Sequence, residues 1–266
     1  MTGSVAAKGR WVYVCGLLAA IVVGFCAVAA EAQTTPGWSS NPYPGFFDVA
    51  APGRFSLTLF GGGFLSDQYA TTQEGVQAEQ SITQYVGVVA RATGYQLYMG
   101  HGFSNPLLPN PPTGVSGSSR YNFGRFQGGV DFAVTPTTHV YLLGGDDGGN
   151  SHNANFEGDI SSWILVHSAH PINFLVSSVH SWQNDITASS IDVRAVVLST
   201  EDYMLLAGAG GVIYGGGFVS SVAGQGGPDL GVYYRPWQIG LDAQGGYGSP
   251  NGYGQITLYK QFGWTE

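Results

Sequence analysis

The 266-residue chain is short of charge and of thiol groups. Charged residues make up 10% of it, whereas soluble globular domains average about 25%. Its two cysteines, Cys15 and Cys26, both lie in an N-terminal apolar stretch, and Lys260 is the one lysine that follows this stretch. The remainder of the chain therefore has no thiol for a disulfide, a zinc-thiolate site or a cysteine nucleophile.

The chain is also poor in positive charge, with a formal net charge of −8. Proteins that bind nucleic acid neutralise phosphates with lysine and arginine, so we expect no nucleic-acid partner. Glycine runs at 61–63, 208–211 and 215–217 lack the lysine and the following helix of a phosphate-binding loop. We interpret them as places where strands bend or where an interior side chain needs room, and we expect no cofactor.

Glycine and aromatic residues are abundant instead. Glycine, with 42 residues, has about twice its usual share, and the chain contains 15 Tyr, 14 Phe and 6 Trp but 3 Met. Aromatic side chains favour pleated strands over helices. The composition predicts an all-β protein.

The N-terminus has the features of a secretory signal peptide. Lys8 and Arg10 precede an apolar run over residues 11–30, and Ala30 and Ala32 are the small residues that a signal peptidase reads. An uncleaved membrane helix is the alternative for this run. We predict a signal peptide over 1–32, a periplasmic lead-in over 33–52 and one barrel domain over 53–266.

From residue 53, apolar and aromatic segments of about ten residues alternate with clusters of Gly, Pro, Asn, Asp and Ser. Twelve strands are predicted, with ten or fourteen as alternatives. The expected strands are 53–65, 81–92, 94–104, 120–134, 138–147, 155–168, 171–183, 185–199, 203–215, 228–235, 237–247 and 252–263.

The predicted connections alternate between short and long, as in bacterial outer-membrane barrels. Short turns are expected at 92–94, 135–138, 170–171, 199–202 and 235–237, and longer loops at 66–80, 104–119, 148–154 and 216–227. An even number of strands places both ends of the barrel on the periplasmic side.

Several predicted strands have one apolar and one polar face. Phe126, Val130 and Phe132, for example, alternate with Arg125, Gln127 and Asp131. A secreted β-sandwich alternates in the same way, but its water-facing side normally carries many more charges. Lipid around the outer face and a polar lumen explain the low number of charged residues. We therefore predict an antiparallel up-and-down transmembrane β-barrel, with the sandwich as the alternative.

The signal peptide, the strand spacing and the aromatic-rich final strand, Tyr253 to Phe262, make residues 53–266 resemble the general class of bacterial outer-membrane β-barrel proteins. The resemblance implies an outer-membrane location in a Gram-negative bacterium. It also implies three partners, which are outer-membrane lipid, lipopolysaccharide and the barrel assembly machinery. The sequence leaves the oligomeric state open.

Charged residues on the polar faces are predicted to point into the lumen. They either pair and hold the barrel rigid, or form a charged constriction that selects solutes. Tyr85, Tyr98, Tyr233 and Tyr259 are expected to narrow the lumen. The predicted inward charges are Arg54, Arg91, Arg125, Asp131, Glu157, Asp159, Asp192, Arg194 and Asp242.

No catalytic or metal site is predicted. The Ser and His pieces of a hydrolase are present as His101 with Ser104, His167-Ser168 and His180-Ser181, but neighbouring strand residues point to opposite faces. His167, His170 and His180 are a weak metal candidate. Loop 144–153 holds oxygen ligands that calcium prefers, although a solvated turn is the simpler interpretation.

We therefore expect a passive small-solute channel, or a structural barrel, without catalysis. The acidic excess favours cations or neutral solutes over anions. A barrel that assists polysaccharide export and a secreted β-sandwich binding protein are the alternatives.

Overall fold

The computed structural model describes residues 55–66, 69–83, 85–99, 119–135, 137–148, 153–182, 186–216, 219–248 and 252–264. The predicted signal peptide, the lead-in and Arg54 lie outside these ranges, as do His101 and Ser104.

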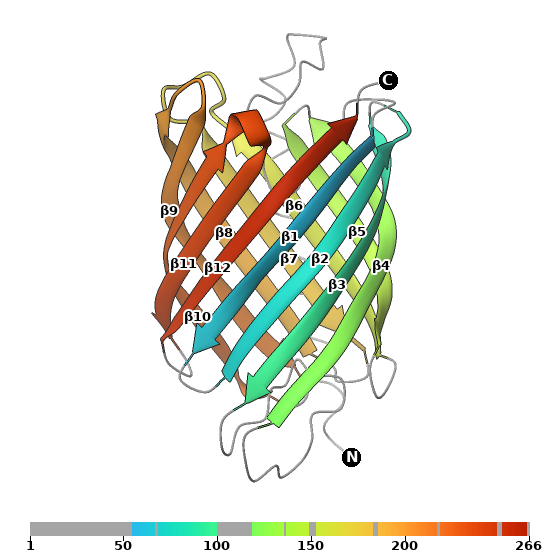
Figure 1. The fold of residues 1–266 in the computed structure, drawn as a ribbon. Coiled ribbons are helices and arrows are strands. Elements are labelled where there is room, and N and C mark those ends of the chain that lie inside the picture. Colours follow the sequence, from blue (N-terminus) through green and yellow to red (C-terminus); the bar gives the residue numbers. More distant parts are fainter. Residues whose placement is uncertain are drawn as a thin grey trace. The chain divides into compact units, whose positions relative to one another are not determined.

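The described chain forms one closed antiparallel barrel in which each strand pairs with its neighbours in sequence (Figure 1). Its strands are β1 (Phe55–Ser66), β2 (Tyr69–Ser81), β3 (Val86–Met99), β4 (Ser119–Thr135), β5 (Thr138–Gly148), β6 (Asn153–Ile164), β7 (Ile172–Ser181), β8 (Ile186–Ser199), β9 (Tyr203–Gly216), β10 (Val219–Tyr234), β11 (Ile239–Gly248) and β12 (Tyr253–Trp264).

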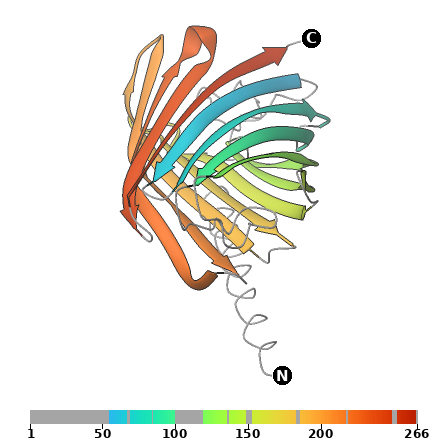
Figure 2. The same ribbon diagram turned by 60° about the horizontal axis from the view of Figure 1, so that its bottom comes forward.

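The barrel closes where β1 pairs with β12, from Phe55 opposite Trp264 to Ser66 opposite Tyr253. The turned view shows the strands arranged around a central axis (Figure 2). This closure confirms the predicted up-and-down barrel of twelve strands and excludes the two-sheet sandwich. We call the end with Phe55 and Trp264 the terminal end, and the other the distal end.

Two predicted strand positions are wrong. Residues 92–94 were expected to form a turn, but they lie in the middle of β3 and pair with both β2 and β4. The polar segment predicted as loop 66–80 is β2. In a barrel the polar face of a strand turns to the lumen, so a glutamine-rich segment without apolar alternation still completes the ladder.

The predicted alternation of loop length is only partly correct. Most turns at the terminal end are short, and the turn between β10 and β11 is the 3-10 helix η2 (Arg235–Trp237) followed by Gln238 with φ 53°. The connection between β6 and β7 is longer than the predicted turn at 170–171, because it spans residues 165–171. At the distal end, however, the connections 67–68 and 217–218 are equally short, and most of predicted loop 216–227 is β10. The connection 100–118 is the longest.

Side chains alternate between the lumen and the outer face, as predicted for β4, β6 and β11. Gln127 and Asp131 are buried in the lumen, whereas Phe126 and Phe132 are exposed on the outer face. A lipid-facing surface accounts for this reversal of the usual rule that apolar residues are inside, because hydrocarbon surrounds the wall. Among the described residues, no helix has the length and apolar character needed to cross a membrane.

Exposed aromatic rings mark both edges of the apolar outer wall. Tyr85, Tyr203 and Trp237 lie at the terminal end, and Tyr98 and Tyr247 near the distal end. Trp237 precedes β11 and Tyr247 lies near its distal end, ten residues later, which corresponds to roughly 25 Å along the axis for a strand tilted by about 40°. This spacing matches the apolar band of outer-membrane barrels. The prediction that Tyr98 narrows the lumen was wrong, because Tyr98 shares the outward parity of the exposed Val88 on β3. Tyr85 lies in the turn before β3 and is exposed.

Candidate functional site

The first polar cluster of the lumen is centred on Arg91 of β3. Its Nη1 lies 2.6 Å from Oε1 of Glu157 and its Nη2 lies 3.1 Å from Oδ2 of Asp159, both on β6. Its Nε donates to Oε1 of Gln77 at 2.9 Å. All four side chains are buried. One guanidinium therefore links three strands across the lumen.

This Arg91 cluster continues toward β5. The amide of Gln127 donates to Oε2 of Glu157 at 2.7 Å and to Oδ1 of Asn155 at 3.0 Å. The amide of Asn155 donates to Oδ1 of Asp147 at 2.9 Å. Arg125 donates from Nε to Oδ1 of Asp147 at 2.6 Å and from Nη2 to Oδ2 at 2.9 Å. Bidentate arginine–carboxylate pairs are strong and directional, so the network holds this wall rigidly.

The second polar cluster is centred on Arg194 of β8. Its Nη1 lies 2.6 Å from Oδ1 of Asp242, its Nε lies 3.7 Å from Oδ2 of Asp229, and its Nη2 donates to Asn173 at 3.0 Å. Asp192, two residues earlier on the same inward face, accepts from Nε2 of Gln244 at 2.8 Å. This Arg194 cluster joins β7, β8, β10 and β11.

Glycine makes room for the Arg194 cluster. A Cβ on Gly210 would collide with the Asp192 carboxylate and the Gln244 amide, and a Cβ on Gly231 would lie 2.6 Å from Oδ1 of Asp242. A Cβ on Gly240 would likewise collide with the Tyr259 ring. The interpretation of run 208–211 as space for interior side chains is therefore confirmed at Gly210.

These spaces predict a contrast between two alanine variants. Gly210→Ala should destabilise the barrel by about 1–3 kcal/mol, because the new methyl group must displace paired polar groups. Gly144 faces outward with nothing within 4 Å of a Cβ, so Gly144→Ala should be neutral or stabilising by up to about 1 kcal/mol. Urea unfolding of the two variants in detergent micelles measures the difference, and equal midpoints would contradict the assignment.

A cavity of about 200 Å³ lies beside the Arg194 cluster. Arg194 and the three aspartates of the cluster line it from one side, and Gln73 of β2 and Leu175 of β7 also line it. The cavity therefore occupies the lumen between walls that are distant in sequence.

A layer of apolar side chains lies in the lumen toward the terminal end. Its buried members come from β6, β8, β9, β10 and β12, and Phe60 of β1 packs against them. The placement of Tyr233 and Tyr259 in the lumen is confirmed, since both are buried here. The layer consists of Trp163, Val196, Met204, Leu206, Tyr233 and Tyr259.

The predicted inward charges that lie within the described ranges all have lumen-facing positions. The structure divides most of them between the Arg91 and Arg194 clusters, and Asp131 pairs separately with Nδ1 of His139 at 3.1 Å. Their role as a constriction stays a prediction. Arg54 lies outside the described residues, and the members placed are Arg91, Arg125, Asp131, Glu157, Asp159, Asp192, Arg194 and Asp242.

Sequence reasoning missed Asp147, Asp229 and His139. Asp147 was grouped with the polar residues of loop 144–153, but it lies in β5, one residue before the end of the strand, and follows the inward parity of Tyr141 and Leu143. Asp229 shares the parity of Tyr233 on β10. Strand parity could have found both of these carboxylates.

The catalytic and metal candidates that lie within the described residues are not brought together by the fold. His180 contacts Thr187 Oγ1 at 3.2 Å, while its neighbour Ser181 accepts from Asn153 on the other face. Residues 167–168 lie in the turn after β6, not in a strand as predicted. In the part of the chain that the structure describes, no group of three His, Cys, Asp or Glu side chains is placed to hold a metal.

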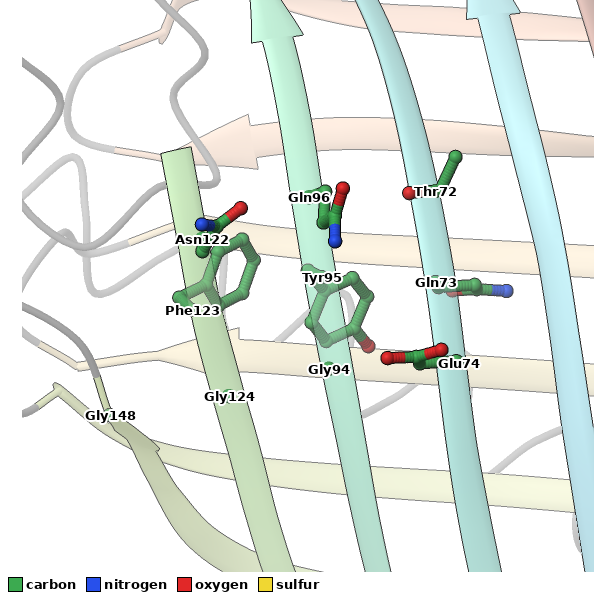
Figure 3. A pocket seen from close by; sticks show the side chains of 10 residues that line it. All are labelled: Thr72, Gln73, Glu74, Gly94, Tyr95, Gln96, Asn122, Phe123, Gly124 and Gly148. Carbon is green, nitrogen blue, oxygen red and sulfur yellow. The ribbon is translucent and has the colours of Figure 1, made fainter. Parts of the chain in front are cut away.

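A second hollow, of about 480 Å³, lies on the outer face of β2, β3 and β4 near the distal end (Figure 3). One rim is formed by three cross-strand neighbours, Thr72, Gln96 and Asn122. The other rim is formed by Glu74 and three glycines, Gly94, Gly124 and Gly148. The outward residues turn polar at this level. The hollow therefore lies at the distal edge of the apolar band.

Comparison with known proteins finds the same architecture. No protein-family model and no curated protein sequence matches the chain. Among solved structures, an outer-membrane channel of Pseudomonas putida F1 matches with a TM-score of 0.54 and 10% identity, over 83% of this chain and 99% of that one.

Two autotransporter barrels also match, at lower similarity. The β-domain of Bordetella BrkA has a TM-score of 0.47 and 9% identity, over 80% of this chain and 100% of that one. The transport unit of Escherichia coli AIDA-I has a TM-score of 0.44 and 9% identity, over 91% of this chain and 97% of that one. The match to the Pseudomonas putida channel, whose TM-score exceeds 0.5, supports the closed β-barrel fold of this chain.

Proposed function

We propose that this outer-membrane β-barrel is a passive channel for small solutes that favours cations and neutral molecules over anions. The observation that carries the proposal is the charge of the lumen. Among the described residues that face it, eight carboxyl groups accompany three arginines, a formal excess of five negative charges. The carboxylates are Glu79, Asp131, Asp147, Glu157, Asp159, Asp192, Asp229 and Asp242, and the arginines are Arg91, Arg125 and Arg194.

The position of these charges favours selection at close range. They lie inside the wall, where low-dielectric surroundings screen them less than exposed loop charges. The Arg91 cluster is largely neutralised by its own pairs, whereas the Arg194 cluster sets three aspartates around one guanidinium beside a cavity. A cation entering the lumen therefore meets its most favourable potential at the Arg194 cluster.

Planar-bilayer recording under a tenfold KCl gradient tests the proposal. The wild-type barrel should show a cation-selective reversal potential that approaches but does not reach the ideal limit of about 59 mV. The double variant D192N/D242N should move the potential toward zero, because two of the carboxylates that attract cations become neutral. Folding of each protein is checked by the mobility shift of the unboiled barrel on a gel.

Two results would contradict the channel proposal. Anion selectivity would show that the lumen carboxylates do not govern permeation. Complete lack of conductance in a correctly folded barrel would favour the second candidate, a structural barrel, for which the apolar layer of Trp163 and Tyr259 is the supporting observation. Narrow apolar constrictions can stay dry and block ions.

A further inference from the structure

We propose that the cavity beside Arg194 is a binding site for a small organic cation, one that carries an ammonium or guanidinium group. The inference names the solute class of the proposed channel and rests on that function only for the solute's route to the site. The binding step itself depends on the cavity and its charges alone.

The charge around the cavity is unbalanced. Asp242 makes the close ion pair with Arg194 at 2.6 Å, and Asp229 lies farther away, at 3.7 Å. Asp192 is held by a neutral amide, that of Gln244, at 2.8 Å. One guanidinium thus faces three carboxylates, and the cavity retains an attraction for further positive charge.

Asp229 supplies a free acceptor in addition to the charge. The Asp229 side chain is 5% exposed, and its Oδ1 has no hydrogen-bond partner among the described residues. A buried acceptor without a partner is costly, and a donor that enters the cavity removes this cost. Because a carboxylate oxygen accepts most strongly from a charged N–H, an ammonium or guanidinium group satisfies both the charge and the hydrogen bond.

The rest of the lining matches an organic cation better than a metal ion or an anion. Among the described residues no three ligating side chains are grouped for a metal, and an anion would be repelled by the surplus carboxylates. Gln255, Thr257 and Ser190 offer further polar contacts, and Leu175 offers an apolar surface for a short carbon chain. The volume of about 200 Å³ limits the ligand to a small molecule.

Isothermal titration of the folded barrel in detergent with methylguanidinium chloride tests the site. We expect saturable binding of one cation, weak or absent binding of tetramethylammonium, which has no N–H donor, and none of urea, which has no charge. D229N should weaken binding by about tenfold or more, because the charged acceptor is lost. D131N is the matched control, since it removes a lumen carboxylate at the His139 pair and should leave binding unchanged.

A second variant tests the site independently, in case D229N fails to fold. Ser190 lines the cavity from β8, and Ser190→Leu fills it without removing a charge. This variant should also abolish binding while the barrel keeps its mobility shift on a gel. Saturable binding that survives both variants, or an equal loss in D131N, would overturn the proposed site.

The channel and the site fail in distinguishable ways. Binding in a barrel that does not conduct would reject the channel and retain the site. Conductance without saturable methylguanidinium binding would reject the site and retain the channel.

Discussion

Arg91→Met is expected to destabilise the folded barrel by about 3–5 kcal/mol. The substitution keeps most of the side-chain volume but removes the guanidinium that lies 2.6 Å from Glu157 and 3.1 Å from Asp159. Both carboxylates are buried, so they would be left as neighbouring negative charges without their cation. Urea unfolding of barrels refolded into lipid vesicles, followed by tryptophan fluorescence, measures the change.

A compensated variant separates the charge effect from the loss of packing. R91M/E157Q/D159N removes the cation together with both carboxylates, and it should recover most of the stability, because paired charges in a barrel interior can be replaced by neutral groups at little cost. Arg235→Met is the matched control, since Arg235 bonds to Ser199 at an exposed turn. A loss below about 1 kcal/mol in Arg91→Met would show that the Arg91 cluster does not hold the wall together.

The second large effect is expected on the outer wall. Leu258 lies at the middle of β12 and is exposed on the outer face. If this face contacts the bilayer midplane, Leu258→Arg should cost about 2–4 kcal/mol of folding free energy in lipid. The same unfolding measurement in vesicles gives the change.

Thr72→Arg is the control for depth in the membrane. Thr72 is exposed on the same outer face, but it lies on the rim of the outer hollow near the distal edge of the apolar band. Its substitution should cost between about 0 and 1 kcal/mol. Equal costs at the two positions would mean that the band does not lie between the aromatic edges formed by Trp237 and Tyr247.

Particular segments show where sequence reasoning succeeded. The parity of Phe126 and Phe132 against Gln127 and Asp131 predicted both faces of β4, because a strand turns successive side chains to opposite sides. The low content of charged residues indicated that lipid, and not water, contacts the outer face of the sheet. These signals depend only on local geometry and composition, so they survive without knowledge of the fold.

Segment 69–81 shows where sequence reasoning failed. β2 has polar residues on both of its faces, so it lacks the alternation that predicts a strand. Gly94 in β3 was interpreted as a turn residue. Such segments become strands because both neighbouring strands supply hydrogen-bond partners along their length. Pairing of this kind is a property of the closed sheet and leaves no periodic signal in the segment itself.

The sequence by itself determined the all-β class and the inward direction of Arg91, Glu157 and Arg194, because alternation and composition act strand by strand. The predicted number of strands was correct only because the missed β2 was offset by the division of β3 into two predicted strands. Only the tertiary structure decided which charges meet. Arg91 reaches Glu157 across 66 positions of sequence, and Arg194 reaches Asp242 across 48. Such pairs depend on the stagger of strands around the closed barrel, which no local pattern encodes.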